Sequence, residues 1–105
     1  MIFNKGGSNV AMGEARRLVV GWAKDPVTGR IADSIRHHFG KHAAEVGATD
    51  LGQYLRKAEA FARNLRGIKP TPVRGTSPGV LRYRKSGRYV DIDSDGKIVS
   101  FGVTR

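Results

Sequence analysis

Residues 51–65, LGQYLRKAEAFARNL, carry the clearest pattern in this chain of 105 residues. Apolar side chains recur there at helical spacing, and polar or basic side chains fill the positions between them. The predicted core stripe consists of Leu51, Tyr54, Leu55, Ala58, Phe61, Ala62 and Leu65. The opposite face consists of Arg56, Lys57, Arg63 and Asn64. Asp50 is the predicted N-cap, with Gln53 as its capping-box partner, so the stretch predicts an amphipathic helix that packs on another layer.

The sequence after this helix changes to strand character. Prolines and glycines from Gly67 to Gly79 predict a loop. The predicted strands are residues 80–85, 88–93 and 97–104, joined by turns at Ser86-Gly87 and Asp95-Gly96. Alternation in the last strand places Val99, Phe101 and Val103 on one face, and Ile98, Ser100, Gly102 and Thr104 on the other. The C-terminal part therefore predicts an antiparallel meander.

Two further helices are predicted before residue 50. Apolar spacing predicts the first over residues 14–22, and Asp25-Pro26 ends it. Thr28 is the predicted N-cap of the second, over residues 30–39, which can break near Gly40. Residues 1–9 are the expected flexible tail. The whole chain fits a single α+β domain, with N-terminal helices packed on a small twisted antiparallel sheet.

The positive charge is concentrated in one segment. The formal net charge is +10, and residues 56–88 hold ten cations and a single carboxylate, Glu59. A localised positive field attracts a polyphosphate, so we expect nucleic acid as the partner; a solubilising surface is the alternative. The absence of cysteine excludes a disulfide framework and a thiolate metal site. No apolar run approaches the ~20 residues that a membrane span needs.

Three histidines lie close together, at His37, His38 and His42. They are the side chains whose unperturbed pKa lies near neutral pH. A helix that continues through Gly40 places His38 and His42 on one face. Acid–base catalysis, metal binding and a hydrogen-bonded core position remain open as their roles. Lys41 disfavours a metal dication, and a convincing third ligand is lacking, so we expect no metal and no cofactor.

Cleavage of RNA at a 2′-hydroxyl suits such a chain, because it needs acid–base groups and phosphate-binding donors but no metal. The candidate catalytic residues are His42, Lys41, Ser100 and His38. In this hypothesis His42 is the principal acid or base, Lys41 supplies charge and Ser100 donates a hydrogen bond. The candidate substrate-binding residues are Arg82, Arg84, Tyr83, Arg88 and Thr104. Arg82 and Arg84 share a strand face and are expected to hold phosphate.

Other side chains in the strands have two readings. Tyr83 and Tyr89 are suited to stacking on a base and equally to packing within the sheet. Asp91, Asp93 and Asp95 are spaced like ligands of a hydrated cation, but the further ligands of a calcium loop are missing. We therefore expect these aspartates to shape a turn.

Several short motifs occur in an order that resembles a known group of proteins. His38-Phe39-Gly40-Lys41-His42 is followed by Glu45-Val46-Gly47 and by Tyr54-Leu55, Ala58 and Phe61, and the chain closes with the hairpin of residues 95–101. This order resembles the C-terminal ribonuclease domains of bacterial polymorphic toxins, the group that contains barnase, EndoU, colicin D and RelE. Val46 stands where that group usually has Phe, and Ser100 where Thr is common.

The resemblance implies a metal-independent ribonuclease, often acting on tRNA, in which Lys41, His42 and Ser100 match functional positions. It implies that the domain is secreted or displayed on the cell surface within a larger protein, through contact-dependent growth inhibition or a similar system. The domain then acts in the cytoplasm of the target cell. It also implies a cognate immunity protein, which we expect to be acidic. The alternatives are a non-catalytic nucleic-acid-binding domain and a DNase.

Overall fold

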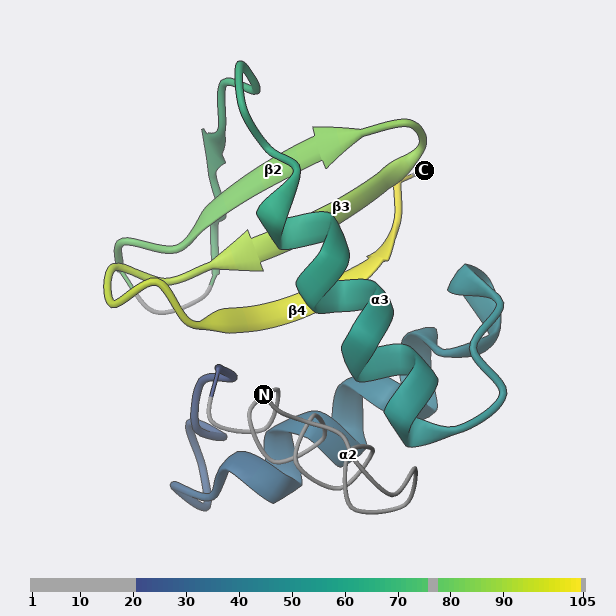
Figure 1. Cartoon of the computed structure of the whole chain (residues 1–105). Helices are drawn as coiled ribbons and strands as arrows, with labels where there is room; N and C mark the ends of the chain where they lie inside the picture. The colour runs from purple at the N-terminus through teal and green to yellow at the C-terminus, as the bar shows by residue number, and fades with distance from the viewer. Residues whose placement is uncertain (1–20, 76–77, 105) are drawn as a thin grey trace, which may run out of the picture.

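The computed structural model describes residues 21–75 and 78–104 (Figure 1). Its elements are helix α2 (Ile31–His42), the short 3₁₀ helix η1 (Ala44–Val46), helix α3 (Leu51–Arg63), and strands β1 (Thr71–Pro72), β2 (Leu81–Lys85), β3 (Arg88–Ile92) and β4 (Ile98–Val103). The strands form one antiparallel sheet in the order β1-β2-β3-β4. This arrangement confirms the predicted α+β class.

Helix α3 begins as its sequence predicts. The Asp50 side chain accepts a hydrogen bond of 2.9 Å from the backbone N–H of Gln53. The Gln53 side chain does not return to Asp50; its Oε1 accepts from the backbone N–H of Thr49 at 2.8 Å and from the Thr49 hydroxyl at 3.0 Å. Tyr54, Leu55 and Ala58 are buried as predicted, whereas Leu51 is exposed.

Helix α2 differs from its prediction at both ends. It runs without a break through Gly40 to His42, three residues beyond the predicted end. Thr28 is not the N-cap: the N-cap is Arg30, and the Thr28 hydroxyl accepts a hydrogen bond of 3.2 Å from the Arg30 backbone N–H. A glycine inside a helix costs about 1 kcal/mol relative to alanine, and burial of the helix face that carries Ile35 offsets this cost.

Strand β1 lies inside the stretch predicted as a loop, so that prediction was wrong at Thr71-Pro72. Thr71 pairs with Arg82, and Pro72 pairs with Leu81. The sequence hides this strand because it is two residues long and contains a proline. The edge of a sheet tolerates proline, since its missing N–H need not serve a second neighbour.

The predicted helix over residues 14–22 lies outside the described residues except for its end, where the prediction was wrong. Trp22 forms a parallel bridge with Ile98 instead of a helical turn. Ala23 N–H donates to the Ile98 carbonyl at 2.8 Å, and Ile98 N–H donates to the Gly21 carbonyl at 2.9 Å. The Trp22 ring is fully buried, 5.8 Å from that of Tyr54. Pairing with β4 and burial of the indole thus override the helical periodicity.

The two faces of the sheet have different roles. Helix α3 crosses one of them (Figure 1), and the Phe101 ring lies 5.8 Å from that of Tyr54 and 5.5 Å from that of Phe61. The Tyr54 hydroxyl also donates to the Phe101 carbonyl at 2.6 Å. Strand register places Tyr83 and Val90 beside Phe101 on this face, which we call the α3 face.

The opposite face, which we call the polar face, consists of two cross-strand rows. One row is Arg84, Tyr89 and Gly102, and the other is Thr71, Arg82, Asp91 and Ser100. Helix α2 lies on the β4 side of the sheet (Figure 1), so its C-terminus meets the end of the first row. The fold thereby brings the histidine helix to the polar face.

Candidate active site on the polar face

The continuous α2 helix stacks His38 on His42. His38 and His42 are one turn apart, and their rings stack with centroids 6.0 Å apart and an interplanar angle of 9°. His37 is exposed, and its ring contacts the edge of the His38 ring with centroids 4.9 Å apart. Lys41 and His42 were predicted together as the catalytic centre. Lys41 is exposed to solvent, whereas His42 is partly buried against the sheet.

The imidazole of His42 is held by a carboxylate. Its Nδ1 lies 2.9 Å from Oε1 of Glu45, which also accepts a hydrogen bond of 3.3 Å from the backbone N–H of Val103. An ionised carboxylate only accepts hydrogen bonds, so Nδ1 carries the proton. This tautomer leaves Nε2 without a proton, so that Nε2 is the acceptor of the ring.

Two hydroxyl groups continue the network from Nε2 of His42. The Tyr89 hydroxyl lies 3.4 Å from Nε2 and 3.0 Å from Oγ of Ser100. Burial raises the pKa of Tyr89, so its phenol stays protonated at neutral pH. Ser100, a predicted catalytic residue, thus joins His42 through Tyr89. Carboxylate, imidazole, phenol and alcohol form one connected chain.

Arg82 is less available to a substrate than predicted. Its Nε and Nη2 donate to the two oxygens of Asp91 at 2.7 and 2.9 Å, and its guanidinium lies 3.9 Å from the centre of the Tyr89 ring. The hydrogen bonds to Asp91 raise the Arg82 pKa further. Arg82 therefore neutralises the buried Asp91 carboxylate and covers Tyr89.

The other predicted substrate-binding residues are divided between the two faces. Arg84 lies on the polar face and is exposed, with its Nη1 donating to the Thr71 hydroxyl at 2.7 Å. Tyr83 packs against the hydrophobic core on the α3 face, and register places Arg88 on that face too. The structure therefore does not bring Tyr83 or Arg88 to His42. Thr104 follows β4 and bonds through its backbone N–H to the Gly87 carbonyl at 2.9 Å.

Gly102 completes the site, although sequence reasoning assigned it no role. A Cβ atom there would lie 2.9 Å from Nδ1 of His42, 3.0 Å from Oε1 of Glu45 and 3.0 Å from Cε1 of Tyr89. Its backbone lies outside the left-handed region, so conformation does not require glycine. A glycine inside a strand often marks a place where another group comes close to the backbone. Its presence within the last strand was the sequence signal for this contact.

His38 is half-buried beside the site. Burial, with smaller contributions from the neighbouring His37, His42 and Lys41, lowers its pKa to about 4. Its Nδ1 is buried without a hydrogen-bond partner among the described residues. His38 is therefore neutral at pH 7 and can accept a proton but not supply one.

The low pKa of His38 predicts how stability depends on pH. An unfolded chain binds the proton near the ordinary pKa of 6.5, whereas the folded chain binds it only near about 4. The contribution of neutral His38 is thus complete above pH 6.5 and is lost as pH falls towards 4. Urea unfolding at pH 7 and pH 4.5 is expected to show a smaller pH effect in His38→Phe than in the wild type. An equal effect in both proteins would exclude His38 as the cause.

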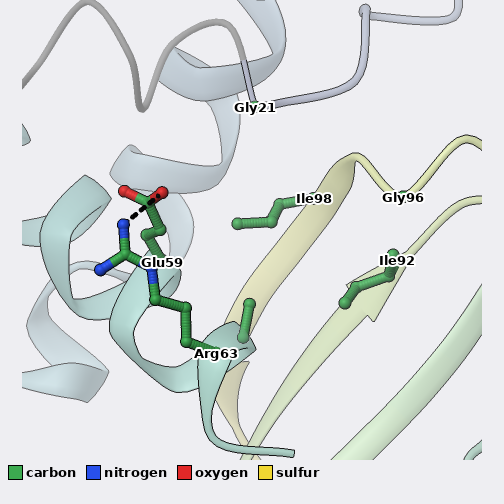
Figure 2. A pocket seen from close by; sticks show the side chains of 7 residues that line it. Gly21, Glu59, Arg63, Ile92, Gly96 and Ile98 are labelled. Atoms are coloured by element: carbon green, nitrogen blue, oxygen red, sulfur yellow. Dashed lines mark hydrogen bonds and ion pairs between the residues drawn. The ribbon is translucent and has the colours of Figure 1, made fainter.

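A pocket of about 240 Å³ lies away from this network (Figure 2). It opens between α3, which contributes Glu59 and Arg63, and the β3–β4 hairpin, which contributes Ile92, Gly96 and Ile98. Arg63 Nη2 donates to Glu59 Oε2 at 2.9 Å along its wall. None of the predicted site residues lines it, so the pocket and the polar face are separate features.

Two of the three aspartates near the hairpin have carboxylates that bind protein partners. Asp91 pairs with Arg82, and Asp93 Oδ1 accepts from the backbone N–H groups of Asp95 and Lys97, both at 2.9 Å. Asp93 thus shapes the turn as predicted, whereas the prediction was wrong for Asp91, which lies within β3 and binds Arg82 across the strands. In the described part of the chain, histidine and carboxylate side chains form no group of three that could hold a metal ion.

Comparison with protein-family models, curated proteins and solved structures finds no match to this chain. Within residues 21–75 and 78–104, no helix has the length and apolar character needed to cross a membrane. The site therefore rests on its own geometry: an imidazole oriented by Glu45 that faces hydroxyls on a sheet face with two arginines.

Proposed function

We propose that this chain is a metal-independent endoribonuclease and that His42 is its principal acid–base residue. The observation that carries the proposal is the orientation of His42, whose Nδ1 is fixed by Glu45 while Nε2 lies 3.4 Å from the Tyr89 hydroxyl, which in turn contacts Ser100. General acid–base catalysis requires a proton carrier held in this manner and within reach of the reacting oxygen.

The proposed reaction is transphosphorylation. Nε2 of His42 takes the proton of a ribose 2′-hydroxyl, and the 2′ oxygen attacks the neighbouring phosphorus. The bond from phosphorus to the 5′ oxygen breaks; that oxygen takes a proton from water, and the imidazolium returns its proton to the hydroxide that remains. The products are a 2′,3′-cyclic phosphate and a free 5′-hydroxyl.

The negative charge that develops on the phosphate needs donors and cations. Within the Tyr89–Ser100 pair one hydroxyl donates to the other, which leaves one hydroxyl proton for the phosphate, and Arg84 and Lys41 supply exposed positive charge near the polar face. Arg82 contributes through its field and by holding Tyr89. His38 is the second candidate acid–base residue, entering the reaction as a neutral base.

The wider role follows from the resemblance to polymorphic toxin domains of the barnase, EndoU, colicin D and RelE group. We propose a toxin carried by a larger secreted or surface protein, which acts on RNA, with tRNA as the favoured substrate, in the cytoplasm of a competing bacterium. An acidic immunity protein is the expected partner, and its association with this chain of net charge +10 should slow as salt is added.

Purified protein incubated with tRNA in the presence of EDTA is the direct test. We expect cleavage to continue, because the proposed reaction uses no metal, and we expect the new 3′ ends to carry cyclic phosphates. Sequencing those ends identifies the RNA and the position of the cut. Cleavage that requires an added divalent cation would overturn the proposal, as would intact RNA.

A non-catalytic RNA-binding domain is the second candidate, and one observation favours it. Tyr89 and Ser100 are each only 6% exposed, and the contact of Tyr89 with His42 also serves to hold α2 on the sheet. The basic segment binds RNA under either hypothesis. Binding without cleavage in the same assay would select this candidate. A DNase is less well supported, because Asp91 and Asp93 already have protein partners.

A further inference from the structure

A second basic surface lies on the α3 face, at the end of the β2–β3 hairpin. We call it the hairpin surface and define it by Arg66, Lys85 and Arg88. Lys85 Nζ donates to the carbonyl of Asn64, the C-cap residue of α3, at 2.8 Å. Arg88 is the cross-strand partner of Lys85. These two contacts bring the end of the helix and the end of the hairpin together.

The carboxylates near this surface are paired with other arginines and do not neutralise it. Glu59 is paired with Arg63 at 2.9 Å, and Asp91 is paired with Arg82 on the other face. The sequence from residue 60 to residue 90 contains no carboxylate. Arg66 and Lys85 are both exposed. Within residues 21–75 and 78–104, no carboxylate forms an ion pair with Arg66 or Lys85, so the surface presents these two cations to solvent.

The hairpin carries positive charge on both of its faces. Successive residues of a strand point to opposite sides, so Lys85 lies on the α3 face while Arg84 lies on the polar face, where it contacts Thr71. The hairpin ends at the two-residue turn Ser86-Gly87, so both faces are reached from its tip. A polyanion that follows the positive charge passes around this tip from one face to the other.

We propose that the hairpin surface binds the phosphates of a second segment of the RNA that is cleaved at His42. The substrate is then a folded RNA that reaches around the hairpin, not a short single strand. This inference rests on the proposed function. Lysine and arginine contacts to phosphate give affinity and fix the position of the RNA without recognising its bases. The surface would therefore select RNA by its folded shape and not by its sequence.

The test compares pairs of substitutions with the same change in net charge. Arg66→Gln/Lys85→Gln neutralises the hairpin surface. Arg30→Gln/Arg36→Gln neutralises two exposed cations that flank Asp33 on α2, and is the matched control. Arg66→Lys/Lys85→Arg keeps the charge. Binding of tRNA and of a short single-stranded RNA is measured over a range of salt concentrations with His42→Ala added to each protein to prevent cleavage.

For tRNA, we expect the slope of log affinity against log salt to become shallower by about 1 to 2 in Arg66→Gln/Lys85→Gln alone. The charge-preserving pair should behave as the parent protein, and the short RNA should bind equally to all of them. Equal losses for both RNAs, or in both neutralised pairs, would overturn the proposal. So would weakened binding to an acidic protein partner with tRNA binding unchanged. The experiment measures binding and not cleavage. If the wild-type protein cleaves no RNA, that result contradicts the proposed function but leaves the test of the hairpin surface valid.

Discussion

Replacement of His42 by alanine is expected to reduce RNA cleavage by about 10²- to 10⁴-fold, which is the range for loss of a general acid or base. The fold should survive, because the Tyr89–Ser100 hydrogen bond and the Arg82–Asp91 pair do not depend on the imidazole. Glu45 also keeps its bond from the backbone N–H of Val103. Initial rates of tRNA cleavage measure the effect, and expression of the variant in a bacterium should no longer arrest growth.

His37→Ala is the matched control for this experiment. It removes an exposed histidine from the same helix, whose ring contacts His38 and not the hydroxyl network. We expect full activity from it. Full activity of His42→Ala would remove His42 from the mechanism. If His42→Ala loses its cooperative unfolding transition, His42→Gln replaces it, since the amide can still donate to Glu45 while offering no titrating group.

Local sequence signals predicted most of the fold. Strands β2, β3 and β4 each begin and end within one residue of the prediction, because Ser86-Gly87 and Asp95-Gly96 mark turns between alternating segments. Strand β1 and the bridge of Trp22 to Ile98 were missed, since both consist of backbone pairing with a distant partner. The unbroken α2 depends in the same way on tertiary packing, which outweighs the propensity of Gly40.

The candidate site was also predictable only where local spacing determines it. Helical spacing linked His38 with His42, and strand alternation put Arg82 and Arg84 on one face, so these relations were predictable. The pairing of Arg82 with Asp91 was not, because it requires the register between two strands. For the same reason Tyr89, weighed only for base stacking or packing, turned out to lie between His42 and Ser100. Residue types indicate candidate chemistry, and register decides which of them meet.

Replacement of Gly102 by alanine is expected to reduce cleavage by about 100-fold, the cost of displacing a catalytic group by roughly 1 Å. The added methyl group would come within 2.9 to 3.0 Å of the two atoms that join His42 to Glu45. The imidazole must then move away from the sheet, and the tautomer is no longer fixed by the carboxylate. Gly102 is thus a positioning residue, and the pH profile of cleavage should shift along with the rate.

Gly40→Ala makes the same chemical change two residues from His42 and separates positioning from a general effect of the extra methyl group. A Cβ atom at Gly40 meets nothing within 4 Å, and alanine there should stabilise α2 by about 1 kcal/mol with activity unchanged. Alanine in a strand is also favoured over glycine by about 0.5 to 1 kcal/mol, so a contact-free Gly102→Ala would be more stable. Chemical denaturation together with nitrogen NMR of the histidine side chains distinguishes the two cases. A more stable Gly102→Ala protein with the wild-type His42 tautomer and rate would show that the close approach of His42 to β4 plays no part in the reaction.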